Sequence, residues 1–284
     1  MGTEQAPKGS PVAVGVDWGA TLAKIAVRRP GEAPEFRLLP SDDPEACRRA
    51  LIELGAARVG VTGGGAERLA RELGSAAVAV NEFAAWGAGA AALLAEDGAG
   101  EPAQRYLLVS LGTGTSVLLV DGLSVSRVGG TALGGGTLLG LAAVLLGTSD
   151  YERVVALAKG GSRREVDLLV SDIYRAGGIP LAGDLTAANF GKLAPRLAAG
   201  ERVAPEDLAH ALMGLIGENV ALVCAGLAAA AQVRRVVFGG STLRGNDALV
   251  EITGAITRAL GREPVFLPRG EHAGALGALL LASR

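Results

Sequence analysis

The sequence is poor in aromatic residues, cysteine and histidine, and it carries almost no excess of either charge. Only 4% of its 284 residues are aromatic, whereas 49% are hydrophobic, so its core must be built mainly from Ala, Val, Leu and Ile. The formal net charge is −2. A protein that binds nucleic acid through a broad basic surface would carry a clear excess of Lys and Arg. We therefore expect no nucleic-acid partner.

Features that direct a chain out of the cytosol are also scarce. The two cysteines, Cys47 and Cys224, are far apart and form no metal-ligand spacing, so we expect two buried thiols in a reducing compartment. The first ten residues, MGTEQAPKGS, contain no apolar signal core. No uninterrupted apolar run reaches the roughly 18 residues of a membrane span. These observations predict a cytoplasmic protein without a membrane partner, in which the apolar run 220–231 forms a buried helix.

The chain repeats one local design. Strands at 12–16 and 22–27 flank the turn Asp17–Thr21, and strands at 106–111 and 116–120 flank the turn 112–115. Each unit is followed by a third strand and then by alternating helices and strands. This pattern indicates an internal duplication, with two helix-flanked sheets and a cleft between them. We predict a flexible tail over 1–11, a first lobe over 12–104 that ends in a linker at 96–104, and a second lobe over 105–284.

Local signals place further elements in both lobes. Asp43 is a candidate N-cap for a helix over 44–54. Ser162 and Glu165 form a capping-box pattern that predicts a helix ending near Tyr174. The other expected helices are 66–73, 82–95, one ending at 146, a long one from Pro205, one between 241 and 265, and a last one from His272. The other expected strands are 58–62, 77–80, 235–238 and 265–267.

The two turns carry residues suited to phosphate. Asp17 at a strand end can hold Mg²⁺ through water, while Gly19 and Thr21 let backbone N–H groups and a hydroxyl reach phosphate oxygens. Lys24 adds a positive charge on the next strand. Each turn alone also fits an ordinary hairpin. The two together indicate a nucleotide held between two phosphate loops.

Two glycine-rich segments extend this hypothesis. The run 129–137 precedes an apolar helix, whose first N–H groups and positive dipole end could bind phosphate. Its spacing fits neither a Walker A loop nor a GxGxxG fingerprint. Gly239, Gly240 and Ser241 follow a strand and could face adenine or ribose. Tight packing and a simple strand-end turn are the alternatives.

Two charged residues are candidates for the chemistry. Glu82 lies between a strand and a helix, where it could deprotonate a substrate hydroxyl. It could equally complement the helix dipole. Arg127 lies at the end of a strand before the glycine-rich run, where it could bind a carboxylate in a bidentate way, or it could be a surface arginine. His210 and His272 belong to no recognisable constellation, and we expect both to be structural or exposed.

With these residues assembled, the chain resembles the type II pantothenate kinases over nearly its whole length after the tail. The resemblance is carried by GVDWGATLAK at 15–24, VTGGGA at 61–66, NEFAAWGAG at 81–89, VSLGTGTSVLLVDG at 109–122, RVGGTALGGGTLLGL at 127–141, DLLVSDIY at 167–174, GDLTAANFGK at 183–192, VVFGGSTLRGN at 236–246 and AGALGALLL at 273–281. The first motif is common to a superfamily of kinases and ATPases. The Arg127 segment and the motif at 183–192 are much more specific.

The resemblance implies an α/β protein with the duplicated ribonuclease-H-like (actin-like ATPase) fold. It implies transfer of the γ-phosphate of ATP to the primary hydroxyl of pantothenate, which opens coenzyme A biosynthesis. Glu82 would be the catalytic base, Arg127, Thr115 and Ser116 would bind pantothenate, and Asp17 would hold Mg²⁺. Family members are usually homodimers. The residues expected to contact ATP are Asp17, Gly19, Ala20, Thr21, Leu22, Ala23, Lys24, Thr113, Gly135, Gly136, Thr137, Leu138, Leu139, Tyr151 and Ser241.

The sequence departs from the family in its first loop, where Ala20 replaces a usual glycine and Trp18 is bulkier than is common. A methyl group would narrow the approach of phosphate if position 20 needs a positive φ. Neither change removes a charged group, so we expect activity to survive.

Three alternatives stay open beside this hypothesis. An amino-sugar kinase, for example one acting on N-acetylglucosamine, usually relies on an Asp base. A dehydratase activase needs cysteines that ligate a cluster, which Cys47 and Cys224 do not supply. A non-catalytic ATP-binding regulator would be expected to lose Glu82 or Asp17, and both are present.

Overall fold

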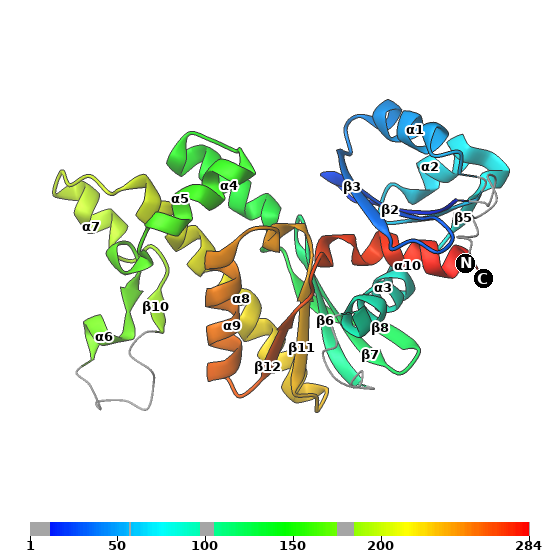
Figure 1. Ribbon diagram of the computed structural model, residues 1–284. Helices are drawn as coiled ribbons and strands as arrows, with labels where there is room; N and C mark the ends of the chain where they lie inside the picture. The colour runs from blue at the N-terminus through cyan, green and yellow to red at the C-terminus, as the bar shows by residue number, and fades with distance from the viewer. Residues whose placement is uncertain (1–11, 57, 97–104, 175–184, 284) are drawn as a thin grey trace, which may run out of the picture.

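The computed structural model describes residues 12–56, 58–96, 105–174 and 185–283. The predicted tail 1–11, most of the predicted linker at 96–104, and Gly183 and Asp184 of the motif at 183–192 lie outside these ranges. Within the described residues, two five-stranded mixed sheets are flanked by helices (Figure 1).

The two sheets share one topology. The first has the order β3-β2-β1-β4-β5 and the second the order β12-β11-β6-β7-β8. In each sheet the first three strands form antiparallel neighbours, and two later strands add in parallel. The predicted duplication is confirmed, because β1 to β5 correspond in order to β6, β7, β8, β11 and β12. Their bounds are β1 Ala13–Trp18, β2 Leu22–Arg28, β3 Glu35–Pro40, β4 Arg58–Thr62, β5 Ala77–Ala79, β6 Arg105–Leu111, β7 Thr115–Asp121, β8 Ser124–Thr131, β11 Arg235–Gly239 and β12 Glu263–Phe266.

Several local predictions are confirmed closely. Helix α1 (Pro44–Glu53) begins after Asp43, whose carboxylate accepts a hydrogen bond of 2.8 Å from the Ala46 N–H. Helices α2 (Ala66–Leu73) and α3 (Glu82–Glu96) lie where the sequence predicts them. Cys47 and Cys224 are buried free thiols.

The helix predicted from Ser162 to Tyr174 is wrong. A 3₁₀ turn (Arg163–Glu165), a short strand β9 (Leu168–Leu169) and one helical turn α6 (Val170–Ile173) occupy the segment. Ser162 does not cap with its side chain. Tertiary contacts override the local pattern: the buried carboxylate of Asp167 accepts from the Phe190 N–H at 2.8 Å, and Arg163 forms an ion pair of 2.7 Å with Glu218.

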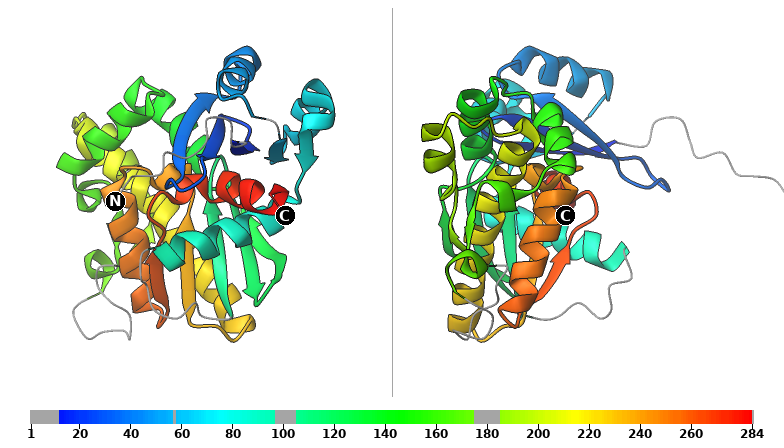
Figure 2. Two further views of the ribbon diagram at one scale, coloured as in Figure 1. Left: turned by 45° about the vertical axis from the view of Figure 1, so that its right-hand side comes forward. Right: turned by 90° about the vertical axis from the view of Figure 1, so that its left-hand side faces the viewer.

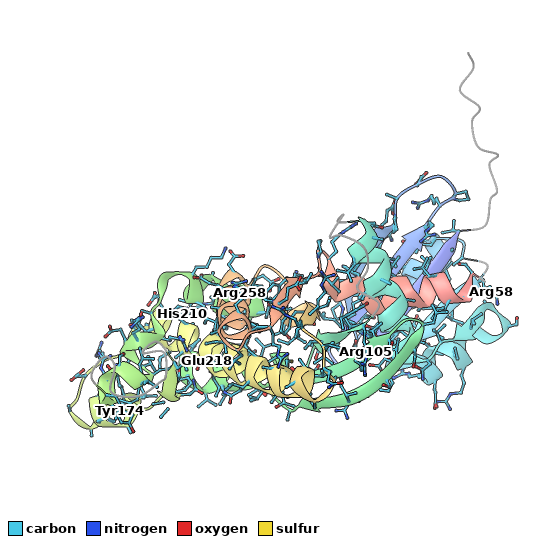
Figure 3. The ribbon with its side chains drawn as sticks, turned by 90° about the horizontal axis from the view of Figure 1, so that it is seen from below. Arg58, Arg105, Tyr174, His210, Glu218 and Arg258 are labelled. Carbon is cyan, nitrogen blue, oxygen red and sulfur yellow. The ribbon has the colours of Figure 1, made fainter. Side chains whose placement is uncertain are left out.

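A helical insertion separates the strand units of the second lobe. It contains α4 (Gly135–Leu146), α5 (Tyr151–Gly160), β10 (Thr186–Ala188), α7 (Leu193–Ala198) and α8 (Pro205–Ala230), and it extends away from the first lobe (Figure 1). Helix α5 was not expected from the sequence, although Asp150 caps it by accepting from the Arg153 N–H at 2.9 Å. His210 and Glu218 both lie on α8 (Figure 3), and the His210 Nδ1 is 2.7 Å from the Gly161 carbonyl oxygen.

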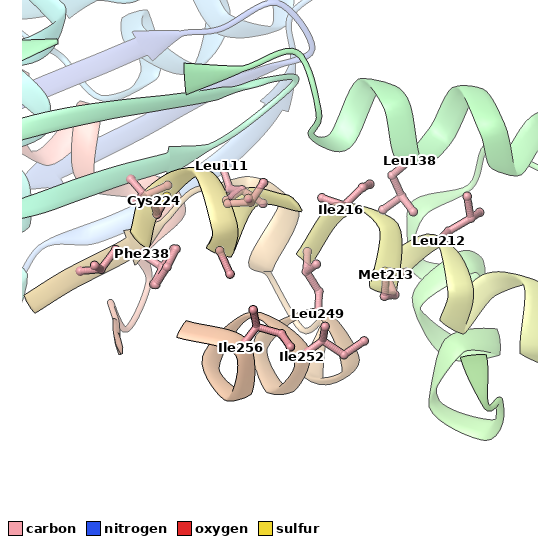
Figure 4. Packing of buried hydrophobic residues seen from close by; sticks show 14 of the residues in the cluster. Leu111, Leu138, Leu212, Met213, Ile216, Cys224, Phe238, Leu249, Ile252 and Ile256 are labelled. Carbon is pink, nitrogen blue, oxygen red and sulfur yellow. The ribbon is translucent and has the colours of Figure 1, made fainter. Parts of the chain in front are cut away.

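Helix α8 is the centre of the second lobe's core. Leu212, Met213 and Ile216 of α8 belong to one buried cluster with Phe238 of β11 and with side chains of α9 (Asp247–Ala259) (Figure 4). Among the described residues, α8 is also the one helix long and apolar enough to span a membrane by length and composition. In its most apolar 18-residue window, 67% is buried inside the protein. The apolar character of α8 is therefore explained by its place in the core, as the sequence predicts.

Helices α3 and α10 (Ala273–Ala282) lie between the two sheets (Figures 1 and 2). Helix α10 packs on β1 and β4 of the first sheet and on α3, and the buried side chains of α3 join those of the second sheet. The predicted lobe boundary near 104 stays a prediction. The last helix of the chain nevertheless packs against the first sheet.

Glycines allow α3 and α10 to pack backbone to backbone. A Cβ at Gly89 would lie 1.8 Å from the Ala273 carbonyl oxygen, and one at Gly277 would lie 1.7 Å from the Ala85 carbonyl oxygen. Real atoms cannot approach so closely. A side chain at either position would therefore push the two helices apart.

We expect Gly277→Ala to destabilise the protein strongly, because the added methyl group meets rigid backbone and not a movable side chain. Overpacked core substitutions cost about 1–3 kcal/mol and occasionally more, so we expect the upper end of that range in urea unfolding. Gly160→Ala is the matched control, since its Cβ would meet only the Glu206 Cγ at 3.7 Å. Equal stability of the two variants would contradict the packing argument.

Candidate active site

A cavity of about 680 Å³ lies between the two lobes and gathers most of the predicted site residues. Its walls come from the turn after β1, the turn after β6, the start of α3, the end of β8 and the segment after β11. Among the residues that line it are Asp17, Gly19, Ala20, Thr21, Leu22, Lys24, Glu82, Thr113, Thr115, Ser116, Arg127 and Ser241.

A buried ion pair lies in this cavity. Asp17 and Lys24 are cross-strand neighbours in β1 and β2, and the Asp17 Oδ2 is 3.5 Å from the Lys24 Nζ. Burial raises the pKa of the Asp17 carboxyl, and the Lys24 ammonium opposes part of that rise. Gly63 and Gly274 make room for the carboxylate, because a Cβ at either would come within 2.6 Å of its oxygens. Asp17 is thus held in a tight backbone cradle with a cation beside it.

The two predicted phosphate loops meet across the cleft. The Thr21 Oγ1 lies 3.1 Å from the Thr113 Oγ1, although 92 residues separate them in the sequence. Ala20 lies in the first loop and does not have a positive φ, so its methyl group causes no backbone strain there. Trp18 points away from the cavity into the core of the first lobe, where its ring lies against Gly65.

The start of α4 supports the second loop. The Gly135 and Gly136 N–H groups donate to the carbonyl oxygens of Gly112 and Thr113, at 2.8 and 2.9 Å. The Thr242 hydroxyl also donates to Gly112 at 2.8 Å. The glycine-rich pattern before α4 predicts that these helix N–H groups are open to a phosphate. In the structure these N–H groups instead hold the loop in place, because the loop carbonyl oxygens already occupy the positive end of the helix.

A second cavity of about 230 Å³ adjoins the first. Thr21, Leu22, Gly112, Thr113 and Ser241 line both. Leu139 and Tyr151 add apolar surface on the side of the insertion. The arrangement provides a polar region between the loops and a more apolar one next to it.

Tyr151 ties the second cavity to the segment after β11. Its hydroxyl lies 2.8 Å from the Thr242 carbonyl oxygen and 3.0 Å from that of Arg244. Burial raises the pKa of Tyr151 to about 12, so the phenol stays protonated and can donate. The Arg244 guanidinium lies 5.7 Å from the ring centre and pairs with Glu152 at 2.6 Å.

Three predicted ATP contacts line neither cavity. The side chains of Ala23 and Leu138 are buried in the cores of the first and second lobe. The Thr137 hydroxyl donates to the Ala132 carbonyl oxygen at 3.1 Å. Only the backbone of Ala23 and Leu138 is left for a ligand. Thr115 does line the large cavity, but its hydroxyl donates to the Leu133 carbonyl oxygen at 2.7 Å.

Glu82 is the first residue of α3 and opens into the large cavity. Asn81 caps the helix by accepting from the Ala84 N–H at 3.1 Å, so the Glu82 carboxylate is not needed for that task. Partial burial and the negative charge of Asp17 raise the pKa of Glu82, and Lys24 opposes them. Its carboxylate has no ion pair within the described part of the chain. A carboxylate with these properties can accept a proton.

A β-bulge positions Arg127. The register of β7 and β8 shifts so that Val117 faces Gly129 while Leu118 faces Arg127, which leaves Val128 as the extra residue. Gly130 is needed beside it, since a Cβ there would lie 2.9 Å from the Arg127 Nη2. Within the described ranges Arg127 pairs with no carboxylate. A free guanidinium in the cavity wall suits an anionic ligand.

The cavity wall also contains residues that the sequence did not predict, and two of them carry large or charged side chains. Trp86 lies one helical turn after Glu82 on α3, and Glu271 lies in the 3₁₀ turn η4 (Gly270–His272) before α10. The spacing of four residues from Glu82 could have indicated Trp86. His272 is buried and stacks on Phe36 with ring centres 4.7 Å apart, and burial lowers its pKa to about 4. It is structural, as expected.

Comparison with known proteins agrees with this geometry. The Fumble family model matches residues 42–281. A type II pantothenate kinase of Bacillus cereus (strain G9842) is 34% identical over 95% of this chain and 98% of its own length. One of Oceanobacillus iheyensis is 35% identical over 94% of this chain and 98% of its own length.

Two solved structures share the fold at low sequence identity. The (R)-2-hydroxyglutaryl-CoA dehydratase component A of Acidaminococcus fermentans has a TM-score of 0.64 at 18% identity and covers 96% of this chain and 98% of its own. A glucokinase of the ROK family from Streptomyces griseus has a TM-score of 0.60 at 15% identity and covers 96% and 99%. They confirm the two-lobed, actin-like α/β fold. The near full-length identity to the curated relatives goes further: this chain belongs to the family of type II pantothenate kinases.

Proposed function

We propose that this protein is a pantothenate kinase, which transfers the γ-phosphate of ATP to the primary hydroxyl of pantothenate and so forms 4′-phosphopantothenate, the first step of coenzyme A biosynthesis. The observation that carries the proposal is the composition of one cavity. Two phosphate loops line it together with the Glu82 carboxylate and the Arg127 guanidinium, neither of which forms an ion pair with another described residue. The names of the relatives supply the acceptor.

ATP fits the two adjoining cavities. Its phosphates would lie between the loops that carry Thr21 and Thr113, with the Lys24 ammonium as counter-charge. Its nucleoside would extend past Ser241 toward Leu139 and Tyr151. Because α4 and Thr242 hold the second loop in place, its backbone is already ordered before the ligand arrives. Such preorganisation lowers the cost of binding.

Asp17 is the residue suited to hold Mg²⁺. Its buried carboxylate lies in the cavity, and the described residues contain no cluster of three or more His, Cys, Asp or Glu. This composition fits Mg²⁺, which in kinases keeps several waters and is held by one or two carboxylates together with substrate phosphates. When bound, the ion would neutralise charge on the phosphate oxygens.

Arg127 and Glu82 divide the work on the acceptor. The guanidinium of Arg127 would bind the pantothenate carboxylate through paired N–H donors. Glu82 would accept the proton of the primary hydroxyl of pantothenate while the hydroxyl oxygen forms a bond to the γ-phosphorus. The bond between that phosphorus and the bridging oxygen breaks, and ADP leaves.

The direct test is ATP consumption by the purified protein with Mg²⁺ and pantothenate, with N-acetylglucosamine, or with no acceptor. We expect turnover that depends on pantothenate. Turnover with the sugar alone would overturn the acceptor while keeping the ATP site. Absence of turnover with both would favour a non-catalytic ATP-binding regulator.

We expect Glu82→Gln to lower kcat by about 10²–10⁴, the usual contribution of a positioned general base. Because the pKa of Glu82 is raised and the base must be deprotonated, the wild-type kcat/KM should fall on acidification already above the ordinary carboxyl value of 4.5. Steady-state kinetics across pH measure both effects.

Glu53→Gln is the control for that substitution, since Glu53 is exposed on α1. It should leave kcat and the pH profile unchanged. ATP binding should survive in Glu82→Gln. Unaltered turnover of Glu82→Gln would remove Glu82 from the chemistry.

Arg127→Ala should raise the KM for pantothenate far more than the KM for ATP, because it removes a counter-charge for the acceptor alone. A bidentate pair between charged groups contributes about 1.5–3 kcal/mol, or roughly 10- to 100-fold. Arg127→Lys should recover part of the loss, since it keeps the charge without the fork. Equal rises in both constants would contradict the assignment.

We further propose that the protein is a cytoplasmic homodimer. Its free thiols suit a reducing compartment. Two contacting helices each expose one large apolar side chain that a partner subunit would cover: Val144 of α4 is 81% exposed and Leu222 of α8 is 52% exposed. A dimer contact over either helix would remove such a side chain from water, which favours association.

Leu222→Glu should convert the dimer to a monomer, because it places a charge in the apolar contact. Light scattering coupled to gel filtration measures the mass. Ile52→Glu is the control: Ile52 is 63% exposed on α1 in the other lobe and should not alter the mass. A monomeric wild type, or a dimer that survives Leu222→Glu, would contradict this interface.

A further inference from the structure

Glu271 is a mostly buried carboxylate that neither the fold nor the proposed phosphoryl transfer uses. It lies in η4 and lines both the large cavity and a neighbouring cavity of about 230 Å³ around residues 238–245 and 266–271. Its side chain is 16% exposed. Burying a charge to this degree is costly unless a partner compensates it.

No protein partner does so within the described residues. The nearest candidate is the His272 Nε2, 3.8 Å from the Glu271 Oε1. That ring is neutral near pH 7, because burial and nearby Lys24 and Arg269 lower its pKa to about 4. Arg269, two residues earlier, pairs instead with Glu96 at 2.6 Å and lies over Phe36. Glu271 therefore keeps its acceptor oxygens for a ligand.

The position of Glu271 is on the nucleoside side of the site. The turn η4 packs on the 3₁₀ turn η3 (Ser241–Leu243). The segment Ser241–Thr242 lines the second cavity, and Ser241 lines the large cavity as well. The charge of Glu271 also reaches Tyr151 in the second cavity, where it contributes to the raised pKa of the phenol.

The charge of Glu271 decides which part of a nucleotide it can bind. A carboxylate repels phosphate, whose counter-charge in this cavity is Lys24. An ionised carboxylate is an acceptor with two oxygens and pairs well with hydroxyl donors. The 2′- and 3′-hydroxyls of ribose are two adjacent donors, and an acidic side chain binds a ribose hydroxyl in the same way in dinucleotide folds.

We propose that Glu271 binds the ribose hydroxyls of ATP and makes the enzyme select ribonucleotides over 2′-deoxyribonucleotides. The proposal rests on the proposed function only in that ATP is the phosphate donor. It does not depend on the identity of the acceptor.

The test compares ATP with 2′-deoxyATP in the wild type, Glu271→Ala and Glu271→Gln. Loss of one hydrogen bond to a charged acceptor corresponds to about 10- to 100-fold, so the wild type should prefer ATP by about that factor in kcat/KM. Glu271→Ala should lose most of its activity with ATP and much less with 2′-deoxyATP, which brings the ratio close to one. Glu271→Gln keeps one acceptor oxygen and should lie between them. The KM for the acceptor should not change.

Two measurements keep the outcome independent of the acceptor and of folding. Binding of a non-hydrolysable ATP analogue and of its 2′-deoxy form, followed through the fluorescence of Trp86 in the cavity wall, gives the same ratio without any acceptor. Glu251→Gln, an exposed carboxylate on α9, should behave as the wild type. Urea unfolding shows whether Glu271→Ala folds. If it does not, the ratio of ATP to 2′-deoxyATP in the nearly isosteric Glu271→Gln tests the proposal.

A wild type without preference for ATP would overturn the proposal. A preference for ATP over 2′-deoxyATP that persists unchanged in Glu271→Ala would also overturn it. If that variant only needs a higher Mg²⁺ concentration, Glu271 acts on the metal ion and not on the ribose, and the proposal fails as well. If pantothenate is not phosphorylated but the binding ratio shifts as expected, the acceptor assignment fails and the role of Glu271 stands. A protein that binds neither nucleotide overturns both.

Discussion

The backbone contact between α3 and α10 holds the two sheets in a fixed relation, and the site depends on that contact. Gly89 and Gly277 let the helices approach so closely that carbonyl oxygens occupy the space of a side chain. Both helices begin at the cavity. Glu82 is the first residue of α3, and Glu271 lies two residues before the first residue of α10. Gly274, in the first turn of α10, borders the Asp17 carboxylate. One packing interaction therefore places three carboxylates around a single cleft.

The charges in the cleft are kept in different states by different surroundings. Asp17 is buried and forms an ion pair with Lys24, so its carboxylate is held in place beside the phosphate loops. Partial burial and the nearby charge of Asp17 raise the pKa of the Glu82 carboxyl above its ordinary value, which suits a group that accepts a proton. Arg127 lies on a bulged strand, pairs with no carboxylate among the described residues, and supplies positive charge where an acidic acceptor could lie. The division of roles among these groups follows from burial and spacing more than from residue type.

The helix start at α4 illustrates how a recognised pattern can serve another purpose. A glycine-rich run before an apolar helix suggests a phosphate bound on the helix N–H groups. Here Gly135 and Gly136 donate to the carbonyl oxygens of Gly112 and Thr113. The helix dipole acts on the phosphate loop and only through it on a ligand. A rigid loop at this place is consistent with a site that positions phosphates before the chemistry.

The sequence by itself determined the features that depend on neighbouring residues. The strand–turn–strand units, the cap at Asp43, the places of Asp17 and Lys24 on successive strands, and the candidates Glu82 and Arg127 all follow from local patterns, and family motifs indicated the acceptor. The cap at Asp150 was equally local and was overlooked. Only the tertiary structure decided the rest. The segment 162–174 does not form the predicted helix, because Arg163 pairs with Glu218 and Asp167 accepts a hydrogen bond from Phe190, both far along the chain. Glu271 has no local signal at all, since it becomes a site residue only when the last helix returns to pack between the two sheets and brings the turn η4 before it to the cavity.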